Sequence, residues 1–167
     1  MKRPTTAGFT ILEVMVTAVI VLLLAGMLVP NLGRTVQEAQ ETAVVQDLER
    51  LRRAVDFYAF QHNDVLPGVD TFGVWLPATF QAQLLIASDR DGNTAAVGTA
   101  GFPYGPYLET GIPANPYNQL DTVKVVAPGV AFMAPDNTSG WVFLADTGEL
   151  RANTPGVTVS GRNIYGL

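Results

Sequence analysis

The chain has 167 residues, no cysteine, one histidine and a net charge of −5 from 15 acidic and 10 basic residues. The lack of cysteine excludes disulfides, thiolate zinc sites and cysteine nucleophiles, and a single histidine cannot form a histidine pair for a metal. The acidic balance argues against a basic surface for phosphate backbones, so no nucleic-acid partner is expected. The length fits one domain, and a mean hydropathy of +0.22 beside 16 Gly and 11 Pro predicts that the apolar residues are concentrated in one segment.

That segment runs from Phe9 to Val29. As a helix its 21 residues reach about 31 Å, which matches the hydrocarbon thickness of a bilayer. Lys2 and Arg3 precede it, so the positive-inside rule places the N-terminus in the cytoplasm. A secretory signal peptide is one interpretation. A retained anchor is favoured, because the run is longer than a signal-peptide core and residues 29–34 contain no A-x-A-like cleavage site.

Glu13 lies inside this apolar segment. An ionised carboxylate in a bilayer costs at least ~2.5 kcal/mol and calls for a cationic partner from the same or a neighbouring chain. The alternative is a glutamate near the membrane edge that reaches water.

The residues around Glu13 resemble the processing site of type IV prepilins and type II secretion pseudopilins. A short basic leader ends in Gly8, Phe9 follows, Glu13 is fifth after the glycine and Pro30 is twenty-second. The resemblance implies that a prepilin peptidase cuts between Gly8 and Phe9 and methylates the new amine. It also implies that Glu13 faces the N-terminal ammonium of an adjoining subunit and sets the axial register. Losing one member of such a pair strands the other at roughly 3–5 kcal/mol.

Beyond Pro30 the pattern becomes amphipathic, and the spacing predicts one long helix from about Thr10 to about His62. Its apolar stripe should pack on a globular domain. Pro30 removes a backbone hydrogen bond, so we expect a bend or a locally melted turn there. A two-chain coiled coil is the less favoured alternative, because small residues and a tyrosine interrupt the stripe. We expect His62 to be solvated at the helix end. The stripe consists of Leu32, Val36, Ala39, Ala43, Val44, Leu48, Leu51, Val55 and Tyr58.

The next segment is rich in glycine and proline, with one short helix predicted over Pro77–Ala87. Asp89, Asp91 and Asn93 then alternate like the opening of a calcium loop. An EF-hand would continue with glycine at position 94 and an acid at position 100, and this chain has neither. A solvated turn is therefore favoured over calcium, and no cofactor is expected.

The C-terminal part is predicted to form strands. A hairpin joins the third and fourth of them through a three-residue turn, 146–148, in which Gly148 takes a positive φ. One face of the third strand should pack against the long helix. The predicted strands are Thr122–Val126, Val130–Met133, Gly140–Ala145, Glu149–Ala152 and a weaker edge strand, Val157–Ser160.

Four further segments extend the resemblance. Residues 105–108, 112–116, 140–143 and 147–149 are similar to the GPYL, P-x-NP and terminal-hairpin segments of type II secretion pseudopilins. The chain lacks the paired C-terminal cysteines of many type IV pilins, which favours the secretion branch. It has no clear copy of the acidic loop that binds calcium in major pseudopilins.

Together these observations predict an α+β, pilin-like fold in which a long N-terminal helix packs on a small antiparallel sheet. The expected divisions are a leader (1–8), a transmembrane and filament-core helix (9–30), an amphipathic helix (31–62) and a periplasmic domain (63–167). No catalytic motif occurs, so no enzyme activity is expected.

The resemblance implies a structural subunit of a secretion filament. Its expected partners are a prepilin peptidase, copies of itself, other pseudopilins and an inner-membrane assembly platform. It would cross the bacterial inner membrane once before assembly, with a periplasmic C-terminal domain. The alternatives are a type IV pilin for adhesion, motility or DNA uptake, and a monomeric membrane-anchored binding protein.

Overall fold

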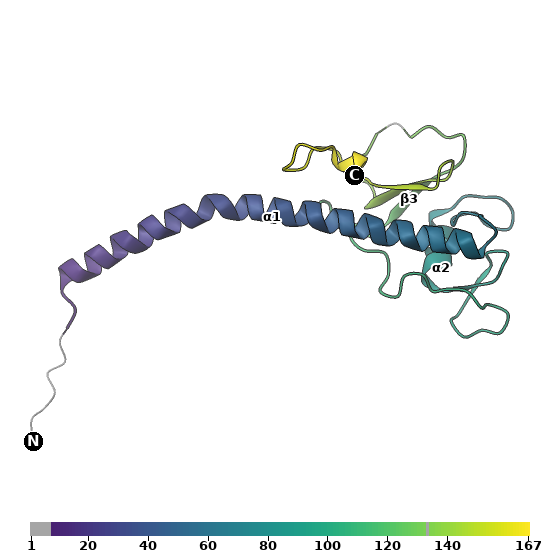
Figure 1. Ribbon diagram of the computed structural model, residues 1–167, viewed down its shortest axis with the longest axis horizontal. Coiled ribbons are helices and arrows are strands. Elements are labelled where there is room, and N and C mark those ends of the chain that lie inside the picture. The colour runs from purple at the N-terminus through teal and green to yellow at the C-terminus, as the bar shows by residue number, and fades with distance from the viewer. Residues whose placement is uncertain (1–7, 133) are drawn as a thin grey trace, which may run out of the picture. The chain divides into compact units, whose positions relative to one another are not determined.

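The structure is a computed structural model that describes residues 8–132 and 134–167, without the side chains of residues 27–32 (Figure 1). It divides into two compact units, residues 1–38 and residues 39–167, which we describe separately. Apart from Gly8, the predicted leader lies outside the described residues. The predicted α+β class is confirmed, since a long N-terminal helix is followed by a small mixed sheet.

The long helix, α1, spans Ile11–Gln61 and contributes to both units. Its bounds agree within one residue with the prediction. The helix passes position 30 without a break, so the melted turn that was one of two expectations is absent from the described backbone. The side chain of Pro30 is among those that the structure does not describe.

In the second unit the apolar stripe of α1 is buried by the chain's own domain. Val44, Leu48, Leu51, Val55 and Tyr58 are each at most 1% exposed and form one core with the sheet. The coiled-coil alternative is therefore wrong for this stretch, because a second chain would have to displace the domain.

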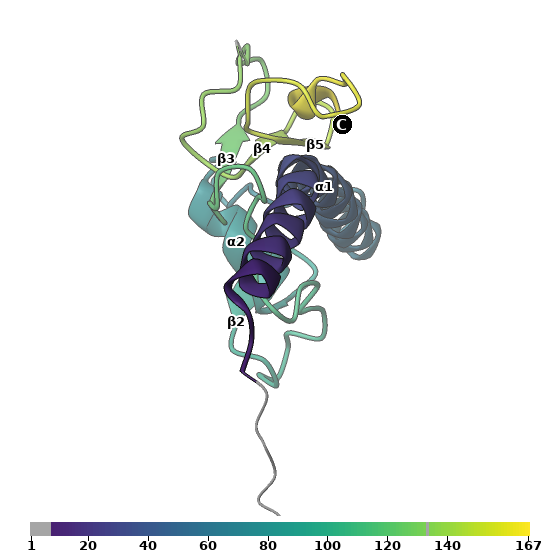
Figure 2. The ribbon, with the colours of Figure 1, turned by 90° about the vertical axis from the view of Figure 1, so that its left-hand side faces the viewer.

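The principal sheet contains three strands in the order β3–β4–β5, namely Val123–Val126, Trp141–Leu144 and Glu149–Ala152. Figure 2 shows them side by side. The β4–β5 pair is the predicted antiparallel hairpin, but β3 is parallel to β4, so the sheet is mixed rather than antiparallel. Parallel pairing follows from the long 127–140 connection, which returns the chain to the same end of the sheet.

The hairpin turn is one residue longer than predicted. Leu144 pairs with Glu149, which leaves the four residues 145–148 between them. Gly148 has the expected positive φ, 71°, and its N–H donates to the carbonyl of Leu144.

Two predicted strands are wrong. Around Val130 the chain forms a turn instead. Gly129 has a φ of 74°, and its N–H donates a hydrogen bond to the carboxylate of Asp146. Met133 lies outside the described residues. The predicted edge strand at 157–160 is reduced to a single bridge between Val157 and Asn163. A turn closes here, because the N–H of Gly161 donates back to the carbonyl of Thr158. The β-branched residues of these two segments predicted strands, but the glycines beside them favour turns.

The short helix α2 spans Pro77–Leu85, two residues shorter than predicted, with proline in its first turn. Phe80 and Leu84 enter the core from α2. A two-stranded sheet follows, β1 at Ala87–Ser88 and β2 at Thr94–Ala95, which pair antiparallel. The C-terminus ends in a 3₁₀ turn, η1, at Ile164–Gly166.

Of the segments that resemble pseudopilins, 112–116 lies against the start of β4, and 105–108 lies against α2, where the N–H groups of Tyr107 and Leu108 donate to the carbonyl of Leu84. Asn115 is fully buried, and its side-chain amide donates to the carbonyl of Gly140 at 2.7 Å. The indole N–H of Trp141 donates to the carbonyl of Pro113 at 2.8 Å. A Cβ added at Gly140 would come within van der Waals overlap of the Leu120 carbonyl, so no side chain fits there. These contacts of the motif residues hold neighbouring segments of the fold together.

His62 was predicted to be solvated and is instead 1% exposed. Its ring stacks on Tyr58 with centroids 3.8 Å apart. Nδ1 lies 2.8 Å from the carbonyl of Tyr58 and Nε2 lies 3.1 Å from the hydroxyl of Ser88. The helix end is covered by the 86–107 region, which sequence periodicity could not place.

Asp136 accepts hydrogen bonds from Lys124, Thr138 and Asn153, and these hold the pKa of its carboxyl well below the usual range. A lowered folded-state pKa contributes stability that is present above the unfolded pKa, about 4, and is lost as pH falls below it. We expect Asp136→Asn to be less stable than the parent at pH 6, with the gap closing below about pH 4. Urea midpoints at pH 6, 5, 4 and 3 would measure this. A gap that stays constant would show that the charge does not matter.

Candidate processing and assembly site

The Gly8–Phe9 peptide bond precedes α1 in exposed, non-helical backbone. Phe9 is 82% exposed, and the helix begins two residues later at Ile11. An exposed bond outside regular structure is the kind of bond that a peptidase can reach. The sequence-predicted processing residues therefore lie together and accessible, while Lys2 and Arg3 fall outside the described residues.

Thr10 caps the helix. Its Oγ1 accepts from the N–H of Glu13 at 3.2 Å, and its carbonyl accepts from the N–H of Val14. With Glu13 three residues after the cap, the T-x-x-E pattern is that of a capping box. The carboxylate also lies in the first turn, where the positive end of the helix dipole favours it. Sequence reasoning missed the Thr10 cap, although the T-x-x-E pattern was available to find it.

We expect Thr10→Val to fray the first turn of α1. An N-cap hydroxyl contributes about 1 kcal/mol, so amide exchange at Glu13 should become roughly fivefold faster. Thr10→Ser should keep the parent rate. Thr17→Val is a matched control, because the Thr17 hydroxyl donates to the Glu13 and Val14 carbonyls and caps nothing. Equal exchange in Thr10→Val and the parent would contradict the cap.

From Val14 to Leu24 the helix that follows the cap presents exposed apolar side chains on all sides. No charged residue occurs between Val14 and Leu32 in the sequence. No helix built from the described residues has the length and apolarity that a membrane crossing requires. The exposed residues, each at least half exposed, are Phe9, Ile11, Leu12, Val14, Met15, Val16, Val19, Ile20, Val21, Leu22, Leu23 and Leu24.

Glu13 is the one acidic side chain in this apolar stretch. It is exposed, and among the described residues none forms an ion pair with it. The apolar side chains around Glu13 favour burial of this segment, which would also remove water from the Glu13 carboxylate. That desolvation is costly unless a cation pairs with the carboxylate. Pro30, the other predicted assembly residue, is helical in its backbone, and its side chain lies outside the described residues.

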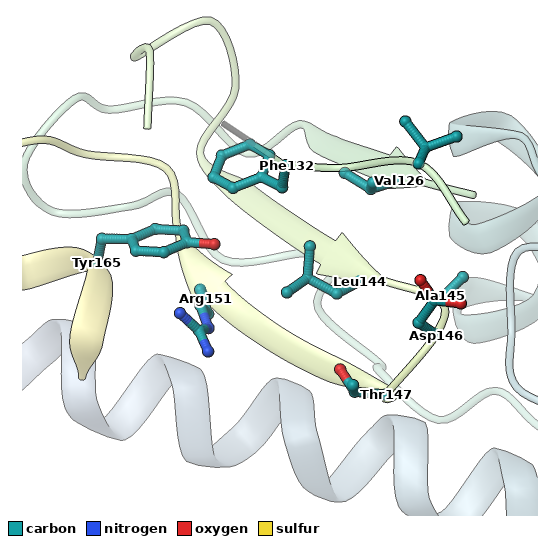
Figure 3. A pocket seen from close by; sticks show the side chains of 9 residues that line it. Val126, Phe132, Leu144, Ala145, Asp146, Thr147, Arg151 and Tyr165 are labelled. Carbon is teal, nitrogen blue, oxygen red and sulfur yellow. The ribbon is translucent and has the colours of Figure 1, made fainter. Parts of the chain in front are cut away.

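A cavity of about 360 Å³ lies on the face of the sheet opposite the α1 core (Figure 3). Phe132 and Tyr165 stack across its wall with centroids 5.2 Å apart, and the guanidinium of Arg151 lies 4.8 Å from the Tyr165 ring. Arg151 also pairs with Glu149 at 2.6 Å. The charged groups are thus engaged within the chain, and no nucleophile with an adjacent base lines this cavity.

Asp89, the first residue of the calcium-like pattern, turns its carboxylate inward on its own loop. Oδ1 accepts from the N–H groups of Asp91 and Asn93, and Oδ2 accepts from the Asn93 amide. These bonds lower the pKa of Asp89 against the opposing effect of burial. No group of three metal-ligating side chains occurs within residues 8–132 and 134–167.

Comparison with known proteins matches residues 3–29 to a family model described as the prokaryotic N-terminal methylation motif. The match covers the predicted processing residues and Glu13. No solved structure matches the chain with significance.

Several relatives are named type II secretion system core protein G. The protein from Aeromonas hydrophila is 40% identical over 63 residues, which is 38% of this chain and 44% of the relative. The one from Vibrio cholerae is 43% identical over 69 residues, 41% of this chain and 47% of the relative. The chain thus spans just under half the length of these two relatives.

The relative from Klebsiella pneumoniae extends the match into the globular domain. It is 30% identical over 122 residues, which is 73% of this chain and 75% of the relative. With the methylation motif at one end and this long match through the domain, the chain belongs to the type II secretion system core protein G family, the pseudopilins.

Proposed function

We propose that the protein is a structural subunit of a type II secretion filament, processed between Gly8 and Phe9 and polymerised through α1. The observation that carries the proposal is the exposed apolar stretch of α1 from Ile11 to Leu24, with a single carboxylate, Glu13, in its first turn. A surface of this size and apolarity must be buried in lipid or against other helices. The protein acts by assembling, and catalysis plays no part in the proposal.

The apolar part of the first unit can be buried either in a lipid bilayer or against other helices in a filament. Glu13 makes the two environments differ in free energy. Burial of each large side chain is worth about 1.5–3 kcal/mol in either environment. In a bilayer the carboxylate costs at least ~2.5 kcal/mol, whereas in a filament the N-terminal ammonium of Phe9 in an adjoining subunit neutralises it. Glu13 therefore biases the subunit from the membrane toward the filament.

In this proposal the precursor is stored in the bacterial inner membrane. The helix from residue 9 to 30 crosses once, the N-terminus is cytoplasmic and residues 63–167 are periplasmic. The partners are a prepilin peptidase, further copies of this chain, other pseudopilins and an inner-membrane assembly platform. No nucleic acid is needed. We propose no cofactor, and calcium at the 89–93 loop would be a departure from this account.

Two alternative functions make different predictions. A type IV pilin would support adhesion, motility or DNA uptake and leave secretion intact. A monomeric membrane-anchored binding protein would keep its leader and form no filament. The family membership favours the secretion subunit over both.

A deletion strain tests the proposal. Loss of this chain should leave the exported cargo in the periplasm, and the parent chain supplied from a plasmid should restore its release. Sheared fractions from cells that overproduce the chain with a prepilin peptidase should contain filaments. Normal release of every exported protein in the deletion strain would contradict a role in secretion.

A further inference from the structure

Phe72 is 89% exposed, more than any other large apolar side chain that the structure describes. It lies at the tip of a turn in the second unit, between α1 and α2. The Asp70 carboxylate accepts hydrogen bonds from the N–H groups of Phe72 and Val74 at 2.9 and 2.8 Å. The N–H of Gly73 donates to the carbonyl of Asp70. These bonds fix the backbone that carries the exposed ring.

The base of this turn is tied to the core. Val69 and Trp75 form an antiparallel bridge, and Trp75 packs against the hydrophobic core. A side chain on a fixed turn loses little conformational entropy on binding, and aromatic anchors dominate many protein interfaces. Phe60 is also exposed, at 78%, but it lies on the side of α1 and does not project from a turn. Phe72 therefore has the form of an anchor that enters a recess.

The cavity over β4 has the size and the lining to receive such a ring. Its apolar lining includes Val126, Phe132, Leu144 and Tyr165, and its volume is about 360 Å³. Figure 3 shows Leu144 between Tyr165 on one side and Thr147 on the other. An apolar cavity of about 150 Å³ is enough to bind benzene in another protein. A phenyl ring therefore fits in this space.

The charges beside the ring and beside the cavity are opposite. Asp70 uses Oδ1 for the turn, and its Oδ2 has no hydrogen-bond partner within the described part of the chain. The side chain of Arg151 lines the cavity and is 30% exposed. It donates to Glu149 through Nη2, which leaves further guanidinium N–H groups for an acid from outside. A turn that enters the cavity would bring Asp70 toward Arg151, and opposite charges orient such a contact.

We propose that Phe72 of one copy of this chain inserts into the cavity between Phe132, Leu144 and Tyr165 of a second copy. The inference rests on the proposed function, because polymerisation through α1 would bring the second units of neighbouring copies together. One inserted side chain buries too little surface for a stable dimer by itself. The association of α1 supplies the high effective concentration at which such a contact forms.

Paired cysteines report the contact cleanly, because the chain has no cysteine of its own. Thr71 adjoins Phe72, Thr147 lines the cavity, and both are exposed. Sheared filaments of the full-length chain with Thr71→Cys and Thr147→Cys, treated with a short bismaleimide, should give cross-linked multimers. Filaments that carry either cysteine alone should stay largely monomeric after the same treatment.

Three further substitutions in the double-cysteine chain test the role of the ring. Phe72→Ser should lower the cross-linked yield at least about tenfold, because the anchor is lost. Val130→Asp, which places a charge in the lining, should do the same. Phe60→Ser is the matched control and should keep the yield. The thermal midpoint of Phe72→Ser should equal that of the parent, because the side chain is exposed in the single chain.

The outcomes separate this contact from the proposed function. A parent chain that forms no filaments would contradict the proposed function itself. Filaments that form without cross-linked multimers, or with a yield that Phe72→Ser does not change, would overturn the contact alone. An equal loss of yield in Phe60→Ser would also overturn it, by showing a general effect of exposed aromatic residues.

Discussion

Glu13→Leu is expected to abolish filament assembly while the chain still inserts into the membrane. In the proposed filament the substitution removes the carboxylate and leaves the ammonium of Phe9 in an adjoining subunit buried without a partner, at roughly 3–5 kcal/mol for each contact. The apolar surface is enlarged, so membrane insertion should improve. Sheared filament yield and carbonate-resistant membrane association measure the two effects separately.

Two further variants separate the charge of Glu13 from its place in the capping box. Glu13→Ala removes both and should fail to assemble like Glu13→Leu. Glu13→Gln keeps a side chain that suits the capping box but removes the charge, so it should keep the parent's helix start and still assemble poorly. Normal filaments from Glu13→Leu or Glu13→Ala would remove the register argument. Normal filaments from Glu13→Gln alone would assign Glu13 to helix capping.

Gly140→Ala is expected to have the largest effect on the stability of the globular domain. The added methyl would overlap the backbone carbonyl of Leu120, which cannot move without disturbing the hydrogen bond that it accepts from the N–H of Asn115. Overpacking costs typically 1–3 kcal/mol, and contact with backbone places this site at about 3 kcal/mol or more. The thermal midpoint of the full-length chain in detergent should fall by roughly 6–12 °C.

Gly166→Ala serves as the control for this prediction. Like Gly140, Gly166 does not need a positive φ, and its nearest contact to an added Cβ is an ordinary 3.8 Å. It should change the midpoint little. If Gly140→Ala were as stable as Gly166→Ala, the tight approach at Leu120 would not be a feature of the protein in solution.

The sequence predicted those features that arise from local periodicity. The 3–4 spacing placed α1 and the buried part of its stripe from Val44 to Tyr58 correctly, whereas Val36 and Ala39 of the predicted stripe are exposed. The hairpin at Gly148 followed from turn chemistry. It could not predict that β3 pairs parallel to β4, because strand direction depends on the path of the intervening loop. It also failed where β-branched residues near Val130 and Val157 lie in turns that are fixed by Gly129 and Gly161.

The burial of His62 and the engagement of two arginines illustrate a second limit. Arg50 donates to the Thr110 hydroxyl, and Arg52 donates to the carbonyls of Leu150 and Leu167. These contacts join residues 60 to 115 positions apart in the chain. No local pattern encodes them. The processing residues, in contrast, form one contiguous motif, which is why sequence alone could single them out.

The most direct test of the account is an intact-mass and N-terminal analysis of the protein recovered from its native membranes. The account predicts a chain that begins at N-methylated Phe9 and lacks residues 1–8. A chain that retains Lys2 and Arg3 in cells with an active prepilin peptidase would contradict processing, and with it the filament.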